Sequence, residues 1–326
     1  TLFQLLEHLR ESGVVPVAET IPADDSPLSV LLSRHAEYLR RERAVAESTV
    51  TGYSEYVRAF VTEHLDGGAK STCRLTAEDP REFLLGHVRK LSPKRAQYMA
   101  TALRSFLRFL FLRGETETDL SLAVPTVRRW RLAALPRRLP EQDVECLLTS
   151  CDRKSPAGLR NHAILLMLAR LGLRAGEIVR LELGDVYWRQ GEIVVRGKGS
   201  SLDRLPLPED VGEALAAYLM KGRPRSSSRL VFLRTRAPHR ELGHSSSVST
   251  IVRRAFARAG LSPPIRGAHV LRHSLASSML RRGASLDEIG QVLRHRSPNT
   301  TEIYAKLDFD ALRDVALPWP TTGGAR

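Results

Sequence analysis

Apolar side chains recur at intervals of three and four residues through the first third of the chain, and this spacing restricts the fold more than any other feature. The pattern is most regular over residues 93–113, which predicts a helix with one apolar face. Because such a face must pack against other elements, the segment predicts a helical domain and not an isolated helix. The apolar positions of this segment are Ala96, Met99, Ala100, Leu103, Phe106, Leu107 and Leu110.

Three further helices are expected before this one, beginning near residues 27, 47 and 78, so that residues 27–113 form an all-helical domain. The helix near Glu47 has Ser48 and Thr49 at its start, and one of them is expected to cap its free N–H groups. Residues 1–26 form an N-terminal extension, with a short amphipathic helix expected over residues 2–10.

Residues 114–140 interrupt the helical pattern, because they contain Gly114 and three prolines. They also carry two groups of basic residues, one beginning at Arg128 and one at Arg137. We expect an interdomain linker with a basic surface. Such a composition suits a segment that crosses a polyanion, and it equally suits an ordinary exposed connection.

The second domain, expected at residues 141–310, begins with helices and then changes its periodicity. Residues 192–196 and 204–207 are expected to be strands joined by a turn at 197–201, and 230–233 a further short strand. The fold class is therefore mostly α with a small β-sheet: an all-helical N-terminal domain, a mixed α/β C-terminal domain and a tail at 311–326. The helices of the second domain are expected at 141–151, 160–172, 175–181, 211–219, 247–259, 271–280 and 286–293.

The chain is strongly basic, with a net charge of +14 and a pI of about 10.3. This charge favours a polyanionic partner, most simply nucleic acid, although an incidentally basic soluble protein is the alternative. Arginine supplies most of the 50 basic residues. Arginine binds phosphate through two parallel hydrogen bonds in a way that lysine does not.

The cysteines Cys73, Cys146 and Cys151 form neither a CxxC pair nor a Cys/His cluster with zinc spacing. A reduced, cytosolic protein without disulfides or a structural metal is expected. The sequence has no stretch of about 18 apolar residues and no glycine-rich phosphate loop, so neither a membrane span nor a nucleotide-driven step is expected. The chain begins at Thr1 without the pattern of a signal peptide, and we expect that the native N-terminus has been trimmed.

The stretch from His269 to Tyr304 concentrates side chains that suit chemistry on a phosphate. His269 and Arg272 are three residues apart and share one face of a helix, and His295 and Tyr304 follow. Cleavage of a phosphodiester needs a nucleophile, positive charge at the non-bridging oxygens, a proton for the leaving oxygen and a group that manages the nucleophile's proton. Metal enzymes use carboxylates and magnesium for this, whereas this chain offers Arg, His, Lys and Tyr.

Two upstream residues extend the set. Arg174 lies between a glycine that ends one helix and the start of the next, where an anion is favoured, but it could equally be a surface partner of Glu177. Lys198 is expected at the tip of a hairpin between two glycines, although such turns are common. Taken singly, the histidines, Arg272 and Tyr304 are also explained by packing, so only the whole set in this order points to catalysis.

In this order the residues resemble the tyrosine recombinase, or phage integrase, family, and the likeness is of the Xer/integrase type. It covers residues 141–310 closely, and the helical domain is similar more loosely to the family's core-binding domain. The matching pieces are Gly-Leu-Arg-Ala-Gly-Glu at Arg174, Gly-Lys-Gly at Lys198, His-Val-Leu-Arg-His-Ser from His269, Leu-Arg-His-Arg-Ser around His295 and Thr-Thr-Glu-Ile-Tyr ending at Tyr304.

The resemblance implies a site-specific recombinase that cleaves and rejoins DNA. Tyr304 would attack the scissile phosphate and form a 3′-phosphotyrosine with a free 5′-hydroxyl. Arg174 and Arg272 would bind the non-bridging oxygens, and Lys198 would protonate the departing 5′ oxygen. No metal, ATP or other cofactor would be needed, because the covalent intermediate keeps the bond energy.

The histidines receive different roles from the same resemblance. His269 would act as an acid and base near the nucleophile, and His295 would hydrogen-bond the phosphate. His273 belongs to the family pattern and is expected to support packing. Family members usually carry Gly just before the residue that matches His295, but this chain has Arg294. We expect its side chain to point to solvent, the alternative being a contact with phosphate.

Two acidic residues are expected to be structural, Glu177 by orienting Arg174 and Asp185 as a cap. Residues 308–315 predict a short amphipathic helix, which would pack on its own domain or on a neighbouring protomer. The side chains expected to bind DNA are Arg40, Arg41, Arg43, Arg58, Lys94, Arg95, Arg104, Arg108, Arg128, Arg129 and Arg131.

The implied partner is double-stranded DNA with inverted-repeat half-sites, bound by a homodimer and brought together in a homotetramer. A bacterial, cytoplasmic, nucleoid-associated enzyme of DNA integration or transposition is expected, and the need for a partner recombinase is left open. Two alternatives compete with this reading. A type IB topoisomerase is disfavoured by the helical N-terminal domain and the compact spacing, and a catalytically silent accessory protein by the complete set of six residues.

Overall fold

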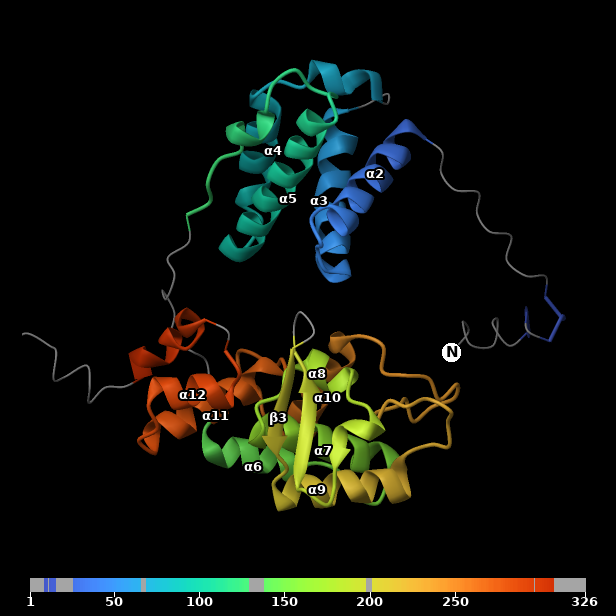
Figure 1. Ribbon diagram of the computed structural model, residues 1–326, viewed down its shortest axis with the longest axis vertical. Helices are drawn as coiled ribbons and strands as arrows, with labels where there is room; N and C mark the ends of the chain where they lie inside the picture. The colour runs from blue at the N-terminus through green and yellow to red at the C-terminus, as the bar shows by residue number, and fades with distance from the viewer. Residues whose placement is uncertain are drawn as a thin grey trace, which may run out of the picture. The chain divides into compact units, whose positions relative to one another are not determined.

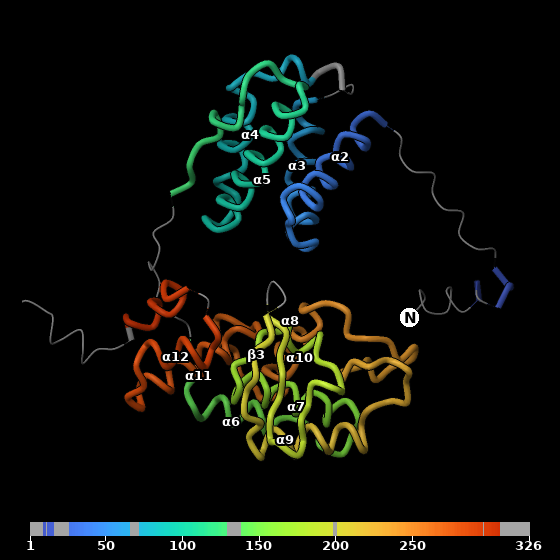
Figure 2. Tube along the Cα trace, in the orientation of Figure 1, coloured from blue at the N-terminus to red at the C-terminus, as the bar shows by residue number. Residues whose placement is uncertain are grey.

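The computed structural model divides the chain into two compact units, Thr1–Arg131 and Leu132–Arg326. The first unit is helical and the second combines helices with a small sheet (Figures 1 and 2). Each unit has its own hydrophobic core. The structure describes residues 9–10, 12–15, 26–65, 69–128, 138–197, 201–295 and 297–307.

The first unit contains the four expected helices, α2 (Pro27–Arg41), α3 (Glu47–His64), α4 (Glu78–Val88) and α5 (Pro93–Leu112). Helix α5 packs against the other three, and its apolar face is fully buried, as its spacing predicts. Two 3-10 turns, η1 (Ala69–Arg74) and η2 (Leu120–Ala123), complete the described part of the unit.

Serine caps and proline explain where two of these helices begin. Ser26 accepts a hydrogen bond from Ser29 N at 3.2 Å and Ser92 accepts one from Arg95 N at 3.4 Å, each with proline in the first turn. The expected cap of α3 is wrong. Ala46 occupies that position and its carbonyl accepts from the backbone, so Ser48 and Thr49 already lie inside the helix.

Part of the segment expected as a linker packs on the first unit. Leu120 and Val124 are buried in the core of α2–α5. Arg104 on α5 donates from one nitrogen to the carbonyl oxygens of Val124 at 3.0 Å and Pro125 at 2.9 Å. Glycine and proline end the helical pattern here, but apolar residues between them still pack into the core of the first unit.

The second unit is built around α7 (Pro156–Arg170), whose residues from Ala163 to Ala169 are all buried. Helix α7 contacts α9, α11 and α6, which brings segments far apart in sequence to one core (Figure 1). The remaining helices are α6 (Glu141–Thr149), α8 (Ala175–Val179), α9 (Glu209–Ala217), α10 (Ser245–Arg258), α11 (His269–Arg281) and α12 (Leu286–Val292), with short turns η3 (Leu183–Asp185), η4 (Tyr218–Gly222), η5 (Pro298–Thr300) and η6 (Glu302–Leu307).

The sheet has three antiparallel strands in the order β1-β2-β3. Strand β2 (Glu192–Arg196) is central and buries Ile193 and Val195, while β1 (Val186–Tyr187) and β3 (Leu202–Pro206) flank it. Buried and half-buried residues alternate along β2, as they do on a strand with one face on the core. The hairpin was therefore predicted correctly, with β3 beginning two residues earlier than expected and β1 not foreseen.

The expected strand at 230–233 is wrong. Leu230 and Leu233 make only isolated bridges, to Glu182 and Glu241. Val231 and Phe232 between them are buried in the core, so the apolar run reflects packing and not a ladder. The predicted helix at 308–315 and the tail lie outside the described residues, as does most of the predicted helix at 2–10.

Candidate active site

The described residues of the predicted set come from three parts of the second unit. Arg174 lies in the turn between α7 and α8, His269 and Arg272 begin α11, and His295 and Tyr304 follow α12. Lys198 lies outside the described residues, between β2 and β3. Sequence separations of about a hundred residues are thereby closed by the packing of α7 and α12 against α11.

Arg272 is held by backbone carbonyls from two different segments. Its side chain is buried, and its guanidinium donates to the carbonyl oxygens of Gly172 and Leu293. Burial, and then repulsion by Arg174 and Arg294, lowers the pKa of Arg272 to about 10, so the group is still a cation at neutral pH. A buried cation held by neutral carbonyls keeps its charge available for an anion.

Gly172 makes this arrangement possible. Its φ of +57° suits glycine, and an added Cβ would lie 2.7 Å from a methyl carbon of Leu293. The glycine therefore permits the turn that ends α7, the close approach of Leu293 and the presentation of its carbonyl to Arg272.

Arg174 is fixed by the carboxylate of Glu177, as expected. Its Nη1 lies 2.7 Å from Glu177 Oε1, and its backbone N donates to Glu177 Oε2 at 2.8 Å. Its Nη2 donates to the carbonyl oxygen of Arg294 at 3.2 Å. Burial raises the pKa of Glu177, but Arg294 and then Arg174 outweigh this effect and hold it below its usual value. Glu177 is therefore an ionised carboxylate inside the site.

Tyr304 is only 1% exposed and packs against Ala276, Ile289 and Leu293. Its hydroxyl lies 2.7 Å from Nδ1 of His273. Burial raises the pKa of Tyr304 to about 12 and lowers that of His273 to about 4, so both groups are neutral at neutral pH. The neutral imidazole can accept the phenolic proton, which gives His273 a contact beyond the packing role expected for it.

The other two histidines lie differently. His269, at the start of α11, is exposed and lies close enough to His273 to contribute to the lowered pKa of that residue. His295 Nδ1 lies 2.8 Å from Thr301 Oγ1, and burial, followed by Arg272 and Arg174, lowers the pKa of His295 to about 4. The spacing of four between His269 and His273 places them on one helical face, and it was the available signal that His273 shares the site.

The expectation that Arg294 points to solvent is wrong. Its side chain is 6% exposed, and its Nη2 lies 2.8 Å from Glu177 Oε2. The side chain turns inward because the buried carboxylate of Glu177 needs a positively charged partner there. Asp185 is a cap, as expected, because its Oδ2 accepts from Glu182 N at 2.8 Å at the start of η3.

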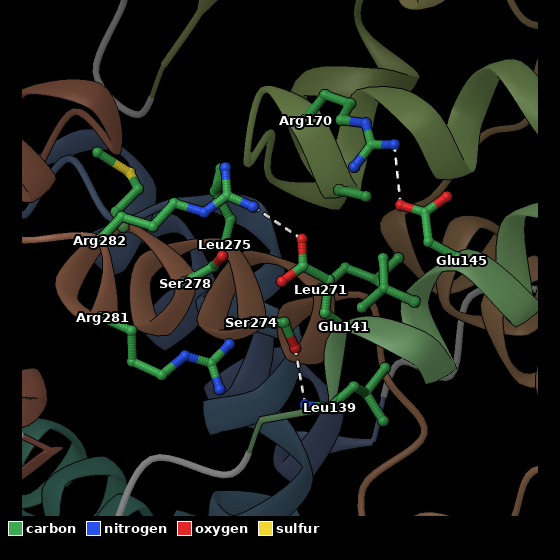
Figure 3. Close-up of a pocket in the computed structure, with 13 residues that line it drawn as sticks. Leu139, Glu141, Glu145, Arg170, Leu271, Ser274, Leu275, Ser278, Arg281 and Arg282 are labelled. Carbon is green, nitrogen blue, oxygen red and sulfur yellow. Dashed lines mark hydrogen bonds and ion pairs between the residues drawn. The ribbon is translucent and has the colours of Figure 1, made fainter.

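A separate pocket lies between α6, α7 and α11 (Figure 3). Ser274 on α11 accepts a hydrogen bond from Leu139 N at 2.8 Å there, and Arg282 pairs with Glu141 at 2.8 Å. None of the predicted catalytic residues lines it. One face of α11 thus lines this pocket, and another face carries Arg272 and His273 in the candidate active site.

Comparison with known families matches both units. The phage integrase family model matches residues 137–310, and the N-terminal SAM-like domain of phage integrases matches residues 32–114. The chain belongs to the phage integrase family. The first match contains every residue of the site described above.

Individual relatives agree with this integrase along most of their length. The protein y4rA of Sinorhizobium fredii is 47% identical over 321 residues, covering 98% of this chain and 78% of y4rA. Tyrosine recombinase XerD of Mycobacterium tuberculosis is 32% identical over 310 residues, covering 88% and 96% of the two chains. The integrase is therefore an enzyme of the tyrosine recombinase class.

A solved structure shows the same fold. The XerH site-specific recombinase bound to palindromic difH substrate, in a post-cleavage complex, aligns with a TM-score of 0.67 at 19% identity. The alignment covers 95% of this chain and 92% of that chain. The expected fold class, an all-helical domain followed by a mixed catalytic domain, is confirmed.

The side chains predicted to bind DNA divide into two groups. Arg40 pairs with Glu47 at 2.7 Å and Arg41 with Glu37 at 2.8 Å, while Arg104 holds carbonyls and Arg108 pairs with Asp119. These contacts stabilise the unit whatever else the arginines do. Arg129 and Arg131 lie outside the described residues. The exposed remainder comprises Arg43, Arg58, Lys94, Arg95 and Arg128.

Two surface hollows of the first unit carry members of this set. One, between α2 and α3, is lined by Arg40, Arg41 and Arg58, and the other, between α3 and α5, includes Lys94 and Arg95. Across the described ranges, no helix is long and apolar enough to span a membrane. Within the same ranges, no group of three or more His, Cys, Asp or Glu side chains is placed to hold a metal ion.

Proposed function

We propose that this integrase is a site-specific DNA recombinase that cleaves and rejoins DNA through a covalent 3′-phosphotyrosine at Tyr304. The observation that carries the proposal is the hydroxyl of Tyr304, which lies 2.7 Å from a neutral imidazole nitrogen and is influenced by the charge of the buried Arg272. A phenol whose pKa is about 12 is a poor nucleophile until a base takes its proton, and His273 is placed to do so.

The first step forms one bond and breaks one. The Tyr304 oxygen bonds to phosphorus while its proton passes to His273 Nδ1, and the bond from phosphorus to the 5′ oxygen breaks. His269 is the second candidate for proton transfer, at the exposed start of α11. Because Tyr304 is 1% exposed, the side chains that cover it must move aside for a phosphate to reach its hydroxyl beside His273.

Cations stabilise the negative charge that develops on the phosphate oxygens. We assign the non-bridging oxygens to Arg174 and Arg272, and a hydrogen bond to the phosphate to His295. Lys198 gives a proton to the departing 5′ oxygen. Since the phosphotyrosine keeps the bond energy, the 5′-hydroxyl of a partner strand can attack it and reverse the step, without ATP or metal.

A nicked DNA substrate that traps the intermediate tests this function. The wild-type protein should form a covalent adduct in the presence of a metal chelator, and Tyr304→Phe should form none. The absence of an adduct with the wild type on its own site would overturn the catalytic proposal. Relaxation of random plasmid without recombination would point instead to a type IB topoisomerase.

The role of Lys198 has a separate test. Lys198→Ala should slow cleavage, and a substrate whose 5′ leaving group needs no proton should restore the rate. Failure to restore it would assign Lys198 another role. Lys221→Ala, in the exposed last part of η4, is a control for the loss of one lysine.

The proposed partner is duplex DNA with inverted-repeat half-sites, contacted by the basic side chains of the first unit. A homodimer on one site and a homotetramer in synapsis follow from such symmetry. The palindromic substrate named for the XerH structure supports the choice of partner. We place the enzyme in the bacterial cytoplasm with the nucleoid. Gel filtration of the protein on one site and on a four-armed junction would measure the assembly.

A further inference from the structure

Arg294 stands where backbone geometry favours glycine. It follows the last turn of α12 with a φ of +54°, and the next residue, His295, closes the turn by donating its N–H to Gly290 O at 2.9 Å. This is a helix end with a left-handed residue, a position usually filled by glycine because a Cβ is strained there. An arginine at this place therefore needs a compensating interaction.

The side chain finds that interaction inside the site. Arg294 Nη2 lies 2.8 Å from Glu177 Oε2, and its Nε lies 3.9 Å from Asp203 Oδ2 on β3. Neither its Nε nor its Nη1 has a hydrogen-bond partner, although both are buried. The guanidinium of Arg294 is therefore desolvated, and its one close partner is the carboxylate of Glu177.

Glu177 already serves another cation. Its Oε1 lies 2.7 Å from Arg174 Nη1, and its Oε2 accepts from Arg174 N at 2.8 Å. Three guanidiniums, of Arg174, Arg272 and Arg294, therefore gather about one fully buried carboxylate. Were residue 294 glycine, the negative charge of Glu177 would act on Arg174 and Arg272 only, and would offset the positive charge that a phosphate needs.

We propose that Arg294 is a positioning residue that offsets the negative charge of Glu177, so that Glu177 cancels less of the positive charge that Arg174 and Arg272 present to the phosphate. The inference rests on the proposed function. Arg294 acts through Glu177 and does not touch the substrate. Its effect belongs to the transition state, where the phosphate gains negative charge, more than to DNA binding.

The backbone makes a clean test possible. The carbonyl oxygens of Leu293 and Arg294 hold Arg272 and Arg174, and these contacts do not depend on the side chain at 294. Arg294→Gly suits the positive φ and removes the whole side chain with its guanidinium, while the backbone carbonyls stay. Arg294→Lys keeps a positive charge and serves as the conservative variant.

The experiment measures single-turnover cleavage of the trapping substrate alongside DNA affinity. Arg294→Gly should cleave about tenfold more slowly while its DNA affinity changes less than about twofold. Arg294→Lys should keep most of the rate. The double variant Arg294→Gly/Glu177→Gln, which also removes the carboxylate charge, should recover most of the rate lost by the single variant.

The outcomes separate the claims. Unchanged cleavage by Arg294→Gly overturns the role of Arg294 but leaves the proposed function intact. A double variant as slow as Arg294→Gly also overturns it, because the side chain would then act by packing. If the wild type forms no adduct while it binds DNA, the proposed function fails, and the role of Arg294 fails with it.

Discussion

Burial moves the pKa values of Tyr304 and His273 in opposite directions. The phenol is neutral up to about 12 and the imidazole down to about 4, so the pair keeps one proton between two neutral groups over a wide range of pH. A neutral acceptor lies 2.7 Å from the hydroxyl, and the bound phosphate has to bring the two pKa values closer before the proton can pass. The arrangement favours His273 over the more exposed His269 as the group that acts on the nucleophile.

The pH dependence of cleavage tests this assignment. Protonation of His273 removes the acceptor, and in the folded protein this occurs as pH falls through about 4 instead of the usual 6.5. Single-turnover cleavage should therefore hold through 6.5 and fall only near 4, with folding followed by circular dichroism. His273→Asn should slow cleavage strongly and His269→Asn less. A fall centred at 6.5, or a greater loss from His269→Asn, contradicts the assignment.

Gly172 predicts a second effect at the scale of one residue. Gly172→Ala meets both a strained φ and a contact of 2.7 Å with Leu293, whereas Gly260 has a φ of +68° with no atom within 4 Å of an added Cβ. Gly260→Ala should lose about 1 kcal/mol of unfolding free energy from strain alone. Gly172→Ala should lose at least about 2 kcal/mol and also slow cleavage, because relief of the contact with Leu293 shifts the backbone whose carbonyl oxygen holds Arg272. Equal losses in urea unfolding would contradict this.

Among the elements, those with regular apolar spacing were predictable from the sequence. Helix α5 and strand β2 have a clear period and lie where expected, within a residue or two at their ends. The run at 230–233 was misassigned because a short apolar stretch reads alike whether a ladder or core packing buries it. The cap of α3 was misplaced because the backbone carbonyl of Ala46 accepts the N–H hydrogen bond at the helix start that a Ser or Thr side chain was expected to accept.

Helix α2 carries a pH-dependent element of stability. His35 is 1% exposed among Phe106 and Phe109, and neither ring nitrogen has a hydrogen-bond partner. Burial lowers the pKa of His35 to about 4. His35 binds a proton near pH 6.5 in the unfolded chain but only near pH 4 in the folded unit. The stability that comes from keeping His35 neutral is therefore fully present above pH 6.5 and is lost as the pH falls toward 4.

The loss should approach about 3 kcal/mol, the free-energy equivalent of the shift. His35→Leu should remove this part of the pH dependence of unfolding, measured by calorimetry on the full chain. His244→Gln, at an exposed histidine before α10, is the matched control and should leave the dependence unchanged. A His35→Leu variant with the wild-type pH dependence would show that another group carries it.

At the scale of the whole molecule, the sequence indicated the residue types of the proposed site but not their pairings. Arg174, Arg272 and Tyr304 could be named from motifs, whereas the inward turn of Arg294 depends on Glu177, which lies 117 residues away in sequence. The contact of His273 with Tyr304 depends on how η6 packs against α11. Such contacts are set by tertiary packing, which periodicity and local spacing do not encode.

The basic charge of the whole chain should appear as a steep dependence of DNA affinity on salt. Each lysine or arginine that neutralises a phosphate releases condensed ions, and the logarithm of the binding constant falls with the logarithm of salt by about 0.9 per contact. Lys94 and Arg95 are exposed and line the hollow between α3 and α5. Replacing both with alanine should make the slope shallower by about 1.8, at the rate of about 0.9 for each.

The matched control changes net charge equally at another place on the first unit. Arg81 on α4 and Arg89 just after it are exposed, and replacing both with alanine should leave the slope nearly unchanged. Fluorescence anisotropy over a series of salt concentrations measures both slopes. Equal changes in the two double variants would mean that net charge, and not contacts made by the hollow, governs binding. A changed slope in the control alone would place the phosphate contacts on α4.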